Sequence, residues 1–415
     1  MIDQDKVIVL GGTFPHITLV SKLKSRGYYV ILIDYLDHPP AKAVADLHIQ
    51  ESTLDKEKVL QIAKKYEVKL VISTCIDQAN VTACYVAEAL GLTRPYSYDK
   101  SLEVTNKLEM KQKMIDNNIN TSKFQEVTSF EDLRIHKLNF PLIVKPVDSN
   151  SSKGVKKIES QEKIQEYVND AIRLSRNGKA IIEEFVKGKE IGIDCYVKNG
   201  EAHVLMVKER RKINLQSNTQ QIFGCLWPTN LIEENLPVMK KLATDIARVF
   251  ELDNTPLMIQ AIANGDQVNV IEFAPRIGGG ESFRIIKLQT GFDFVEAAID
   301  SFLNKEVELD CIPMNHYYAE NFIYIKESSF QKVEGLQELV DEGIIEYFDI
   351  YKAEGTKIAG ELTSNNRVGV FGVKGKEKKD VLKKINVAIQ NMHVYNTLNQ
   401  KVMRKDIYLN EPIKL

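Results

Sequence analysis

The fold of this chain is decided by one stretch, residues 257–280, which reads LMIQAIANGDQVNVIEFAPRIGGG. Two apolar runs, Leu257–Ala263 and Val268–Phe273, flank Asn264-Gly265-Asp266. Asn, Gly and Asp between two such runs are typical of a tight hairpin turn, because these residues accept a positive φ. The stretch therefore predicts an antiparallel hairpin that leads into a glycine-rich loop.

The same hairpin predicts a metal site. If the pairing is centred on Asp266, Gln260 and Glu272 lie opposite each other on one face, because side chains repeat every two residues along a strand. Two oxygen ligands at that position suit Mg²⁺, which keeps waters and substrate phosphates in its other positions. Arg276 and Gly278-Gly279-Gly280 follow, and a guanidinium beside the metal is suited to clamping a phosphoryl group.

Lys145 lies upstream, inside the apolar run PLIVKPV of residues 141–147. A buried lysine is costly unless an anion meets it, so this position indicates an anionic ligand. The segment Asn150-Ser151-Ser152-Lys153-Gly154 follows, and its hydroxyls, backbone N–H groups and glycine suit a loop that closes over phosphates. An ordinary hairpin connection is the alternative for this loop taken alone.

A contact for the rest of a nucleotide is predicted at Glu183-Glu184-Phe185-Val186. A strand is expected to end here, and its backbone can offer an edge to a purine base. Glu190, beyond Gly188, could hold ribose hydroxyls. A solvated run of charges is the alternative for this segment.

The first hundred residues alternate short β-branched runs with helical patterns, which indicates a doubly wound α/β unit. Gly11-Gly12 after the first run and Asp34 at the end of the second are typical of dinucleotide folds. However, Pro15-His16 stand where later glycines should be, which disfavours nicotinamide or flavin binding. The expected strands are Val7–Leu10, Tyr29–Asp34 and Lys69–Thr74, and the expected helices are Ile17–Ser25 and Asp55–Tyr66.

Beyond a helix expected over Leu102–Asn117, the pattern predicts antiparallel strands. Asn199-Gly200 predicts a type I′ turn between two of them. The expected strands are Leu142–Val147, Val155–Glu159, Ala180–Phe185, Ile191–Val197, Ala202–Lys208, Tyr317–Lys326, Gly343–Tyr351 and Val368–Lys374, with helices over Gln161–Leu174 and Lys378–Met392.

Composition narrows the classes of function. The 415 residues are 44% apolar and 27% charged, which indicates a globular protein of more than one domain. The net charge of -2 gives no bulk attraction to nucleic acid or to membranes, and no apolar run is long enough to span a bilayer. The five cysteines lack metal-ligand spacing and are expected to be reduced thiols in the core. We therefore expect a cytoplasmic protein without nucleic-acid or membrane partners.

These motifs, in this order, resemble the ATP-grasp superfamily of carboxylate–amine ligases over essentially the whole chain. The resemblance implies the ATP-grasp fold, a mixture of α/β and α+β, with ATP and with Mg²⁺ or Mn²⁺ as cofactors. A homodimer is a reasonable expectation. The implied parts are a pre-ATP-grasp domain (1–100), a connecting helix (101–120), a small lid subdomain (121–190), a large subdomain with the metal site (191–310) and a C-terminal segment that completes it (311–415).

The resemblance also implies roles for individual residues. Catalytic roles fall to Lys145, Lys153 and Arg276, and metal binding falls to Glu272 and Gln260. The implied nucleotide-binding residues are Lys107, Lys145, Ser151, Ser152, Lys153, Gly154, Glu183, Glu184, Phe185, Val186 and Glu190. The candidates for substrate binding are His16, Arg210, Arg211, Arg284 and Gly279, with a structural role as the alternative for the histidine and the arginines.

The chain departs from the family pattern at two positions. Gln260 stands where many relatives have an acidic residue, and Ala274 stands where an asparagine often adds a metal ligand. The string E-x-A-P-R of residues 272–276 resembles carboxyaminoimidazole ribonucleotide synthetase, but the following Ile277–Gly280 differs from that enzyme. The whole string of residues 272–280 and the overall layout most resemble L-amino-acid ligases and ligases of amino-acid or surface-sugar modification. The C-terminal segment resembles that of biotin carboxylase.

The resemblance implies an enzyme that joins a small-molecule carboxylate to an amine. ATP phosphorylates the carboxylate, and the amine then displaces phosphate from the acyl phosphate, so that ADP and an amide are formed. An amino-acid-type carboxylate and a small amine are the expected substrates. A purine-pathway ligase is one alternative, and a nucleotide-binding regulator without turnover, suggested by Gln260, is another.

Overall fold

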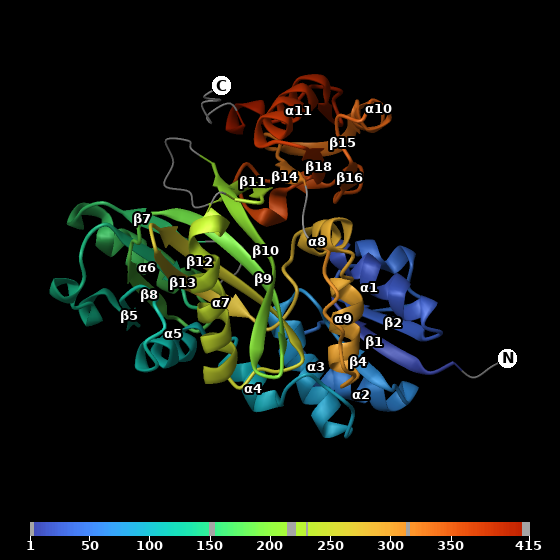
Figure 1. Ribbon diagram of the computed structural model, residues 1–415, viewed down its shortest axis with the longest axis horizontal. Helices are drawn as coiled ribbons and strands as arrows, with labels where there is room; N and C mark the ends of the chain where they lie inside the picture. The colour runs from blue at the N-terminus through green and yellow to red at the C-terminus, as the bar shows by residue number, and fades with distance from the viewer. Residues whose placement is uncertain (1–3, 149–153, 214–220, 230, 313–315, 409–415) are drawn as a thin grey trace.

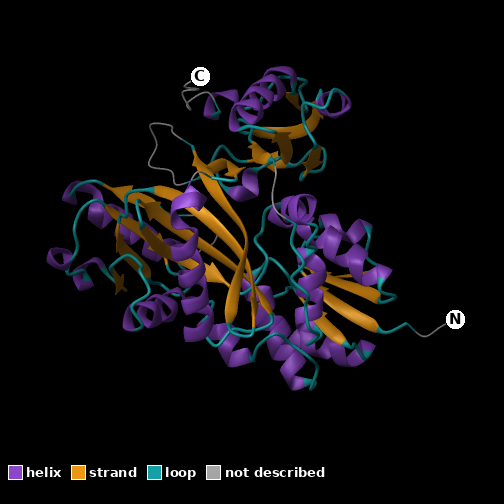
Figure 2. Ribbon diagram, in the orientation of Figure 1, coloured by secondary structure: helices purple, strands orange, loops and turns teal. Residues whose placement is uncertain are grey.

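Three sheet regions succeed one another along the chain: a parallel sheet, a small antiparallel sheet and a large antiparallel sheet that continues into the C-terminal region (Figures 1 and 2). The computed structural model describes residues 4–148, 154–213, 221–229, 231–312 and 316–408, and only the backbone of residues 231–234. No helix in these ranges combines the length and the apolar character needed to cross a membrane.

The N-terminal sheet is parallel, as the alternating pattern predicts, with the strand order β3-β2-β1-β4. Residues 7–10 are fully buried, which explains their unbroken apolar run, because helices cover both faces of most parallel sheets. The sequence pattern missed β3 and α3, and β3 is short and only half-buried. The elements are β1 (Lys6–Leu10), α1 (Phe14–Ser25), β2 (Tyr29–Asp34), β3 (Leu47–Gln50), α2 (Lys56–Tyr66), β4 (Leu70–Ile72) and α3 (Asp77–Ala89).

The single helix expected over Leu102–Asn117 is wrong, because two helices occupy this region: α4 (Tyr98–Glu103) and α5 (Lys107–Asp116). The side chain of Asn106 explains the break. Its Oδ1 accepts hydrogen bonds from the backbone N–H groups of Leu108 and Glu109, so Asn106 caps a new helix start instead of continuing the old helix. The cap places Lys107 at the first turn of α5.

The small sheet is antiparallel throughout, with the order β5-β8-β6-β7, as predicted for its three recognised strands. Helix α6 packs on it over a core that includes Val144, Val168 and Ile182. Burial of such side chains contributes about 1.5–3 kcal/mol each. The elements are β5 (Phe124–Val127), β6 (Leu142–Pro146), β7 (Lys156–Ile158), α6 (Ile164–Leu174) and β8 (Ala180–Glu184).

The large sheet is also antiparallel, with the order β13-β12-β9-β10-β11-β14-β18-β16. Asn199 and Gly200 both have positive φ, 55° and 69°, which confirms the type I′ turn between β9 and β10. Helix α7 crosses this sheet in the foreground of Figure 1. The elements are β9 (Lys189–Lys198), β10 (Glu201–Lys212), β11 (Ile222–Trp227), α7 (Leu231–Val249), β12 (Thr255–Asn264), β13 (Gln267–Ala274), β14 (Tyr317–Ile323), β16 (Tyr347–Ile350) and β18 (Gly369–Gly375).

The hairpin of β12 and β13 pairs Gln260 with Glu272, as predicted, but the predicted centre at Asp266 is wrong. The turn has two residues, Gly265 and Asp266, because Asn264 pairs with Gln267. A β-bulge between Gln260 and Ala261 on one strand, opposite the extra residue Ile271, shifts the register by one. The bulge therefore brings the predicted metal pair into register.

The C-terminal region adds a three-stranded sheet, in the order β17-β15-β19, beside the end of the large sheet. Its core includes Phe330, Val381 and Ile385, and helix α11 packs against β18 and β14. The elements are β15 (Ser328–Glu334), α10 (Leu336–Asp341), β17 (Lys357–Ile358), α11 (Lys378–Asn391) and β19 (His393–Asn396).

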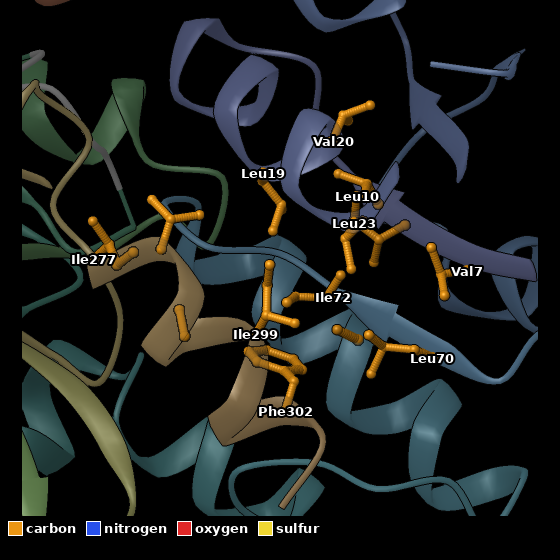
Figure 3. Packing of buried hydrophobic residues seen from close by; sticks show 14 of the residues in the cluster. Val7, Leu10, Leu19, Val20, Leu23, Leu70, Ile72, Ile277, Ile299 and Phe302 are labelled. Carbon is orange, nitrogen blue, oxygen red and sulfur yellow. The ribbon is translucent and has the colours of Figure 1, made fainter. Parts of the chain in front are cut away.

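Helices α8 (Ser282–Thr290) and α9 (Phe294–Phe302) return the chain to the N-terminal sheet. Ile299 and Phe302 of α9 share one buried cluster with residues of α1 and β4, such as Leu23 and Ile72 (Figure 3). Lys22 of α1 adds ion pairs to Asp293 at 2.7 Å and to Glu296 at 3.1 Å. The segment after the hairpin is thus fastened to the parallel sheet, and this brings the glycine-rich loop to the end of β4.

Candidate active site

Lys145 is buried in β6, as its apolar context predicts, and its anionic partner is Glu183 of β8. The Lys145 ammonium lies 2.9 Å from Glu183 Oε1, and the ammonium of Lys111 in α5 lies 3.2 Å from the same oxygen. Burial alone would raise the pKa of Glu183, but Lys111 and Lys145 outweigh it and hold the pKa below its usual value. Two buried lysines therefore share one carboxylate.

Sequence reasoning missed Lys111. It is 1% exposed, donates hydrogen bonds to Thr121 Oγ1 at 2.7 Å and Ser122 Oγ at 3.0 Å, and burial lowers its pKa. A signal was present, because Lys111 follows Lys107 by four residues and so lies on the same face of a helix. Its neighbours Met110 and Met114 mark that face as buried.

The phosphate loop is described only at its end. Ser151, Ser152 and Lys153 lie outside the described residues, so their expected roles stay predictions. Gly154 has a φ of +74°, and an added Cβ would lie 2.9 Å from Leu174 and 3.0 Å from Pro146. The glycine is therefore required both by its backbone conformation and by its packing against the end of β6.

The predicted adenine hinge, at the end of β8, is fixed to its surroundings by polar contacts. Glu184 Oε1 accepts hydrogen bonds from the backbone and side-chain N–H groups of Asn139, at 3.0 and 2.9 Å. The Phe185 N–H donates to Pro141 O at 2.8 Å, and the ammonium of Lys157 stands 4.1 Å from the Phe185 ring centroid. Val186 is half-buried. These contacts hold the segment in place, and nucleotide binding by it stays a prediction.

Glu190, the predicted ribose acid, is the second residue of β9 and is 5% exposed. It accepts hydrogen bonds from Arg210 Nε and from Gln260 Nε2, each at 2.6 Å, and it pairs with Lys212. Burial opposes its ionisation, but Arg210 and Lys212 hold the pKa of Glu190 below its usual value. The substrate candidate Arg210 is thus tied to this carboxylate, beside the metal pair.

Gln260 and Glu272 face each other across β12 and β13, and Glu272 Oε2 lies 3.7 Å from the Lys107 ammonium. Within the described residues there is no group of three or more His, Cys, Asp or Glu side chains placed to hold a metal. Two oxygen donors still fit Mg²⁺, which takes its other ligands from water and phosphate. Because Gln260 turns its amide nitrogen to Glu190, its oxygen is left for this role.

Arg276 makes a bidentate ion pair with Asp77, the first residue of α3, with Nε–Oδ1 at 2.6 Å and NH2–Oδ2 at 2.9 Å. Burial disfavours the guanidinium, but Asp77 raises the pKa of Arg276 and keeps it charged. Tyr96 Oη donates to Pro275 O at 3.3 Å and supports the same loop. Sequence reasoning missed Asp77, because the contact joins residues 199 positions apart.

The other substrate candidates are dispersed. His16 is fully buried in α1, hydrogen-bonded to Thr13 at 2.8 Å, and burial lowers its pKa to about 4, so it is a neutral packing residue. Arg211 contacts Asn321 at 3.1 Å. Gly279 lies near Cys75 O, and Arg284 pairs with Asp349 of β16 at 2.8 Å. Of these four, Gly279 and Arg284 lie in or beside the glycine-rich loop.

The turn after β1 is closed to a dinucleotide. Asp34 accepts hydrogen bonds from the backbone N–H groups of Gly12 at 2.7 Å and Leu36 at 2.8 Å, so its carboxylate serves the fold. A Cβ on Gly12 would lie 2.5 Å from Pro39 Cβ, which leaves no room for a pyrophosphate against this backbone. The five cysteines are free; Cys84, Cys195 and Cys225 lie in the core as predicted, but the prediction of a core position is wrong for the exposed Cys311.

Buried lysines near a carboxylate–amide pair on adjoining strands have the chemistry to meet a polyanion with a divalent cation, such as a nucleoside triphosphate. Comparison with known proteins narrows the class of protein. A family model described as "ATP-grasp domain" matches residues 138–283, which include Lys145, Glu183, Gln260, Glu272 and Arg276.

Relatives agree with that match. The chain is 24% identical over 277 residues to the L-arginine-specific L-amino acid ligase of Bacillus subtilis, covering 64% of this chain and 65% of that protein. It is 29% identical over 190 residues to the formate-dependent phosphoribosylglycinamide formyltransferase of Prochlorococcus marinus strain MIT 9515, covering 44% of this chain and 48% of that protein. The chain thus spans less than two thirds of each relative, so substrates and partners are matters for proposal.

The fold is shared with solved structures over nearly the whole chain. The L-amino acid ligase from Bacillus licheniformis superposes with a TM-score of 0.81 and 20% identity, covering 95% of this chain and 99% of that one. Residues 138–283 therefore match the ATP-grasp domain, as the motifs predicted, and nearly the whole chain shares the fold of that L-amino acid ligase.

Proposed function

We propose that the chain is a carboxylate–amine ligase that forms an amide through an acyl phosphate and releases ADP and phosphate. The observation that carries this proposal is the positive excess around Glu183, where Lys145 and Lys111 share one carboxylate inside the stretch that matches the ATP-grasp domain. A phosphate oxygen beside these ammonium groups would supply the missing anion. The likeness to two L-amino acid ligases supports the substrate class.

In the proposed reaction, a carboxylate oxygen of the substrate attacks the γ-phosphorus of ATP and ADP leaves. The amine then attacks the acyl carbon and phosphate leaves, so an amide forms with loss of protons from the amine. Lys107 and Lys145 hold phosphate oxygens, and Arg276 neutralises charge on the transferred phosphoryl group. Glu272 and Gln260 would hold Mg²⁺, which adds charge neutralisation when bound.

The proposed carboxylate is of the amino-acid type and the amine is small. A purine-type ligase is a second candidate, supported by the 29% identity to the Prochlorococcus enzyme. Its ribose-phosphate substrate would call for a basic turn after β1, whereas residues 11–16 contain no lysine or arginine and the Gly12 N–H is bound to Asp34. A regulator without turnover is a third candidate, which rests on Gln260 alone.

The test is to mix the full chain, Mg-ATP, hydroxylamine and pools of carboxylates, and to assay ADP, AMP and hydroxamate together. We expect ADP and a hydroxamate with amino-acid pools, because hydroxylamine captures acyl phosphates. Lys145→Ala and Glu272→Ala should lower turnover by on the order of 100-fold, whereas the exposed Lys163→Ala should match the wild type.

Other outcomes would exclude the proposal. AMP in place of ADP indicates adenylation, and wild-type turnover in both variants removes the residue assignments. Bound ATP without product from any pool favours the regulator. Circular dichroism of Lys145→Ala separates loss of turnover from loss of fold, because Lys111 still pairs with Glu183 in that variant.

A further inference from the structure

A second buried charge cluster, of opposite sign, adjoins the glycine-rich loop. Glu281 precedes α8, Glu320 lies on β14 and Asp349 on β16, and Glu281 and Glu320 are 1% and 3% exposed. Arg284 of α8 faces two of them, with Nε 3.4 Å from Glu281 Oε2 and NH1 2.8 Å from Asp349 Oδ2. We call Glu281, Glu320 and Asp349 the acidic cluster.

The acidic cluster is undercompensated. Glu320 Oε1 accepts a hydrogen bond from the Glu281 backbone N–H at 3.0 Å, but neither side-chain oxygen of Glu281 has a hydrogen-bond partner among the described residues. The nearby ammonium of Lys208 is itself paired with Asp194 at 3.0 Å. A buried acceptor without a donor is costly, so the site lacks a group that donates hydrogen bonds and carries positive charge.

The pKa of Glu281 also indicates that the acidic cluster lacks positive charge. Burial raises the pKa of Glu281 to about 8, and although Arg284 opposes the shift, the Glu320 and Asp349 carboxylates and Cys75 add to it. Without a cation, Glu281 therefore takes up a proton. A bound ammonium would replace that proton and favour the ionised carboxylate.

The acidic cluster adjoins the glycine-rich loop that follows Arg276. The loop Gly278-Gly279-Gly280 separates it from Arg276, and a Cβ on Gly280 would be 3.3 Å from Glu320 Oε1. Beside Gly279, an added Cβ would meet just Cys75 O, at 3.9 Å, among the described residues. Cys75 lies close enough to both Arg276 and Glu281 to influence the pKa of each.

We propose that the acidic cluster binds the amine substrate of the ligase as a cation, and that this substrate carries a net positive charge. The inference rests on the proposed ligase function. Three carboxylates against the guanidinium of Arg284 leave a negative excess in the described structure, which an ammonium with its three donors would offset. A zwitterionic amino acid would add a carboxylate to this excess, so a simple amine or diamine is the better fit.

The test uses the carboxylate found with hydroxylamine and offers the full chain putrescine, propylamine or L-alanine at equal concentrations. Mass spectrometry measures each amide, with hydroxamate measured in parallel reactions. We expect the putrescine and propylamine amides to exceed the L-alanine amide by about tenfold or more, the ratio that one lost charged hydrogen bond represents.

Variants then locate the site. Glu281→Gln and Glu320→Gln should each lower the ratio of putrescine amide to hydroxamate by about tenfold, because they remove charge that faces the ammonium but not the phosphoryl site. Glu346→Gln is the matched control, since Glu346 is an exposed carboxylate next to β16.

The outcomes separate the two proposals. No hydroxamate from any carboxylate refutes the ligase. Hydroxamate with preference for L-alanine, with no amide from any of the three amines, or with both products falling equally in Glu281→Gln and Glu320→Gln, leaves the ligase standing and overturns the cationic amine site.

Discussion

The buried cluster around Glu183 and the acidic cluster around Glu281 carry excess charge of opposite sign. Around Glu183, two lysines share one carboxylate, whereas in the acidic cluster the one guanidinium of Arg284 pairs with two of three carboxylates. The pKa of Glu183 is held below its usual value, whereas that of Glu281 is raised to about 8. A fold that buries charge unevenly destabilises itself unless a ligand of the missing sign arrives. The sign of the excess charge in each cluster therefore indicates a ligand of the opposite sign.

Removing the carboxylate shared by Lys111 and Lys145 should have the largest effect on stability. Glu183→Gln leaves Lys111 and Lys145 buried without a carboxylate, and removal of one partner from such a buried group costs about 3–5 kcal/mol of the free energy of unfolding. Urea unfolding followed by circular dichroism measures this loss. Glu162→Gln, an exposed carboxylate next to α6, is the control, and we expect it to stay within about 0.5 kcal/mol of the wild type. Equal stability of the two variants would contradict the shared pairing.

Neutralising Glu281 of the acidic cluster should stabilise the protein instead of destabilising it. The folded pKa of Glu281 lies above its unfolded value, so its contribution to stability is complete below about pH 4.5 and is lost as the pH rises towards about 8. From about pH 6 to about pH 8 this loss amounts to about 2.3 kcal/mol. Glu281→Gln cannot ionise, so it should become more stable than the wild type over this range. Parallel stability curves for the two proteins would refute the raised pKa.

The smallest effect concerns how Lys107 is presented to Glu272. Asn106→Ala removes the side-chain cap of α5 and should cost about 1 kcal/mol of stability. Because the first turn of α5 then frays, we expect the KM for ATP to rise by a few fold, consistent with that loss. Asn106→Asp keeps the cap and serves as the control. Steady-state ADP release measures the KM for ATP of both variants. An unchanged KM in Asn106→Ala would indicate that Lys107 does not contribute to nucleotide binding.

The sequence predicted those parts of the fold and the site that depend on local pattern. The hairpin, the Gln260–Glu272 pair and the buried strand of Lys145 follow from side-chain alternation and from the rarity of buried lysine. Asp77 and the acidic cluster were missed, because their partners come from segments that meet only in the folded chain. The break before Lys107 was also missed, although Asn106 carries a cap signal, because the apolar pattern continues across it.

The β-bulge in the hairpin divides it into two separately phased parts. Residues 261–270 pair in one register and the residues beyond Gln260 and Glu272 pair in another. The part next to the turn, residues 261–270, is anchored at its end by Val270. The Val270 N–H donates to Asn120 O at 2.8 Å, and Val270 O accepts from Thr121 Oγ1 at 2.7 Å. A change of length at Gly265-Asp266 is therefore absorbed before it reaches Glu272. That exposed turn is therefore a site where we expect foreign sequence, such as a reporter, to be tolerated without disturbing the metal pair.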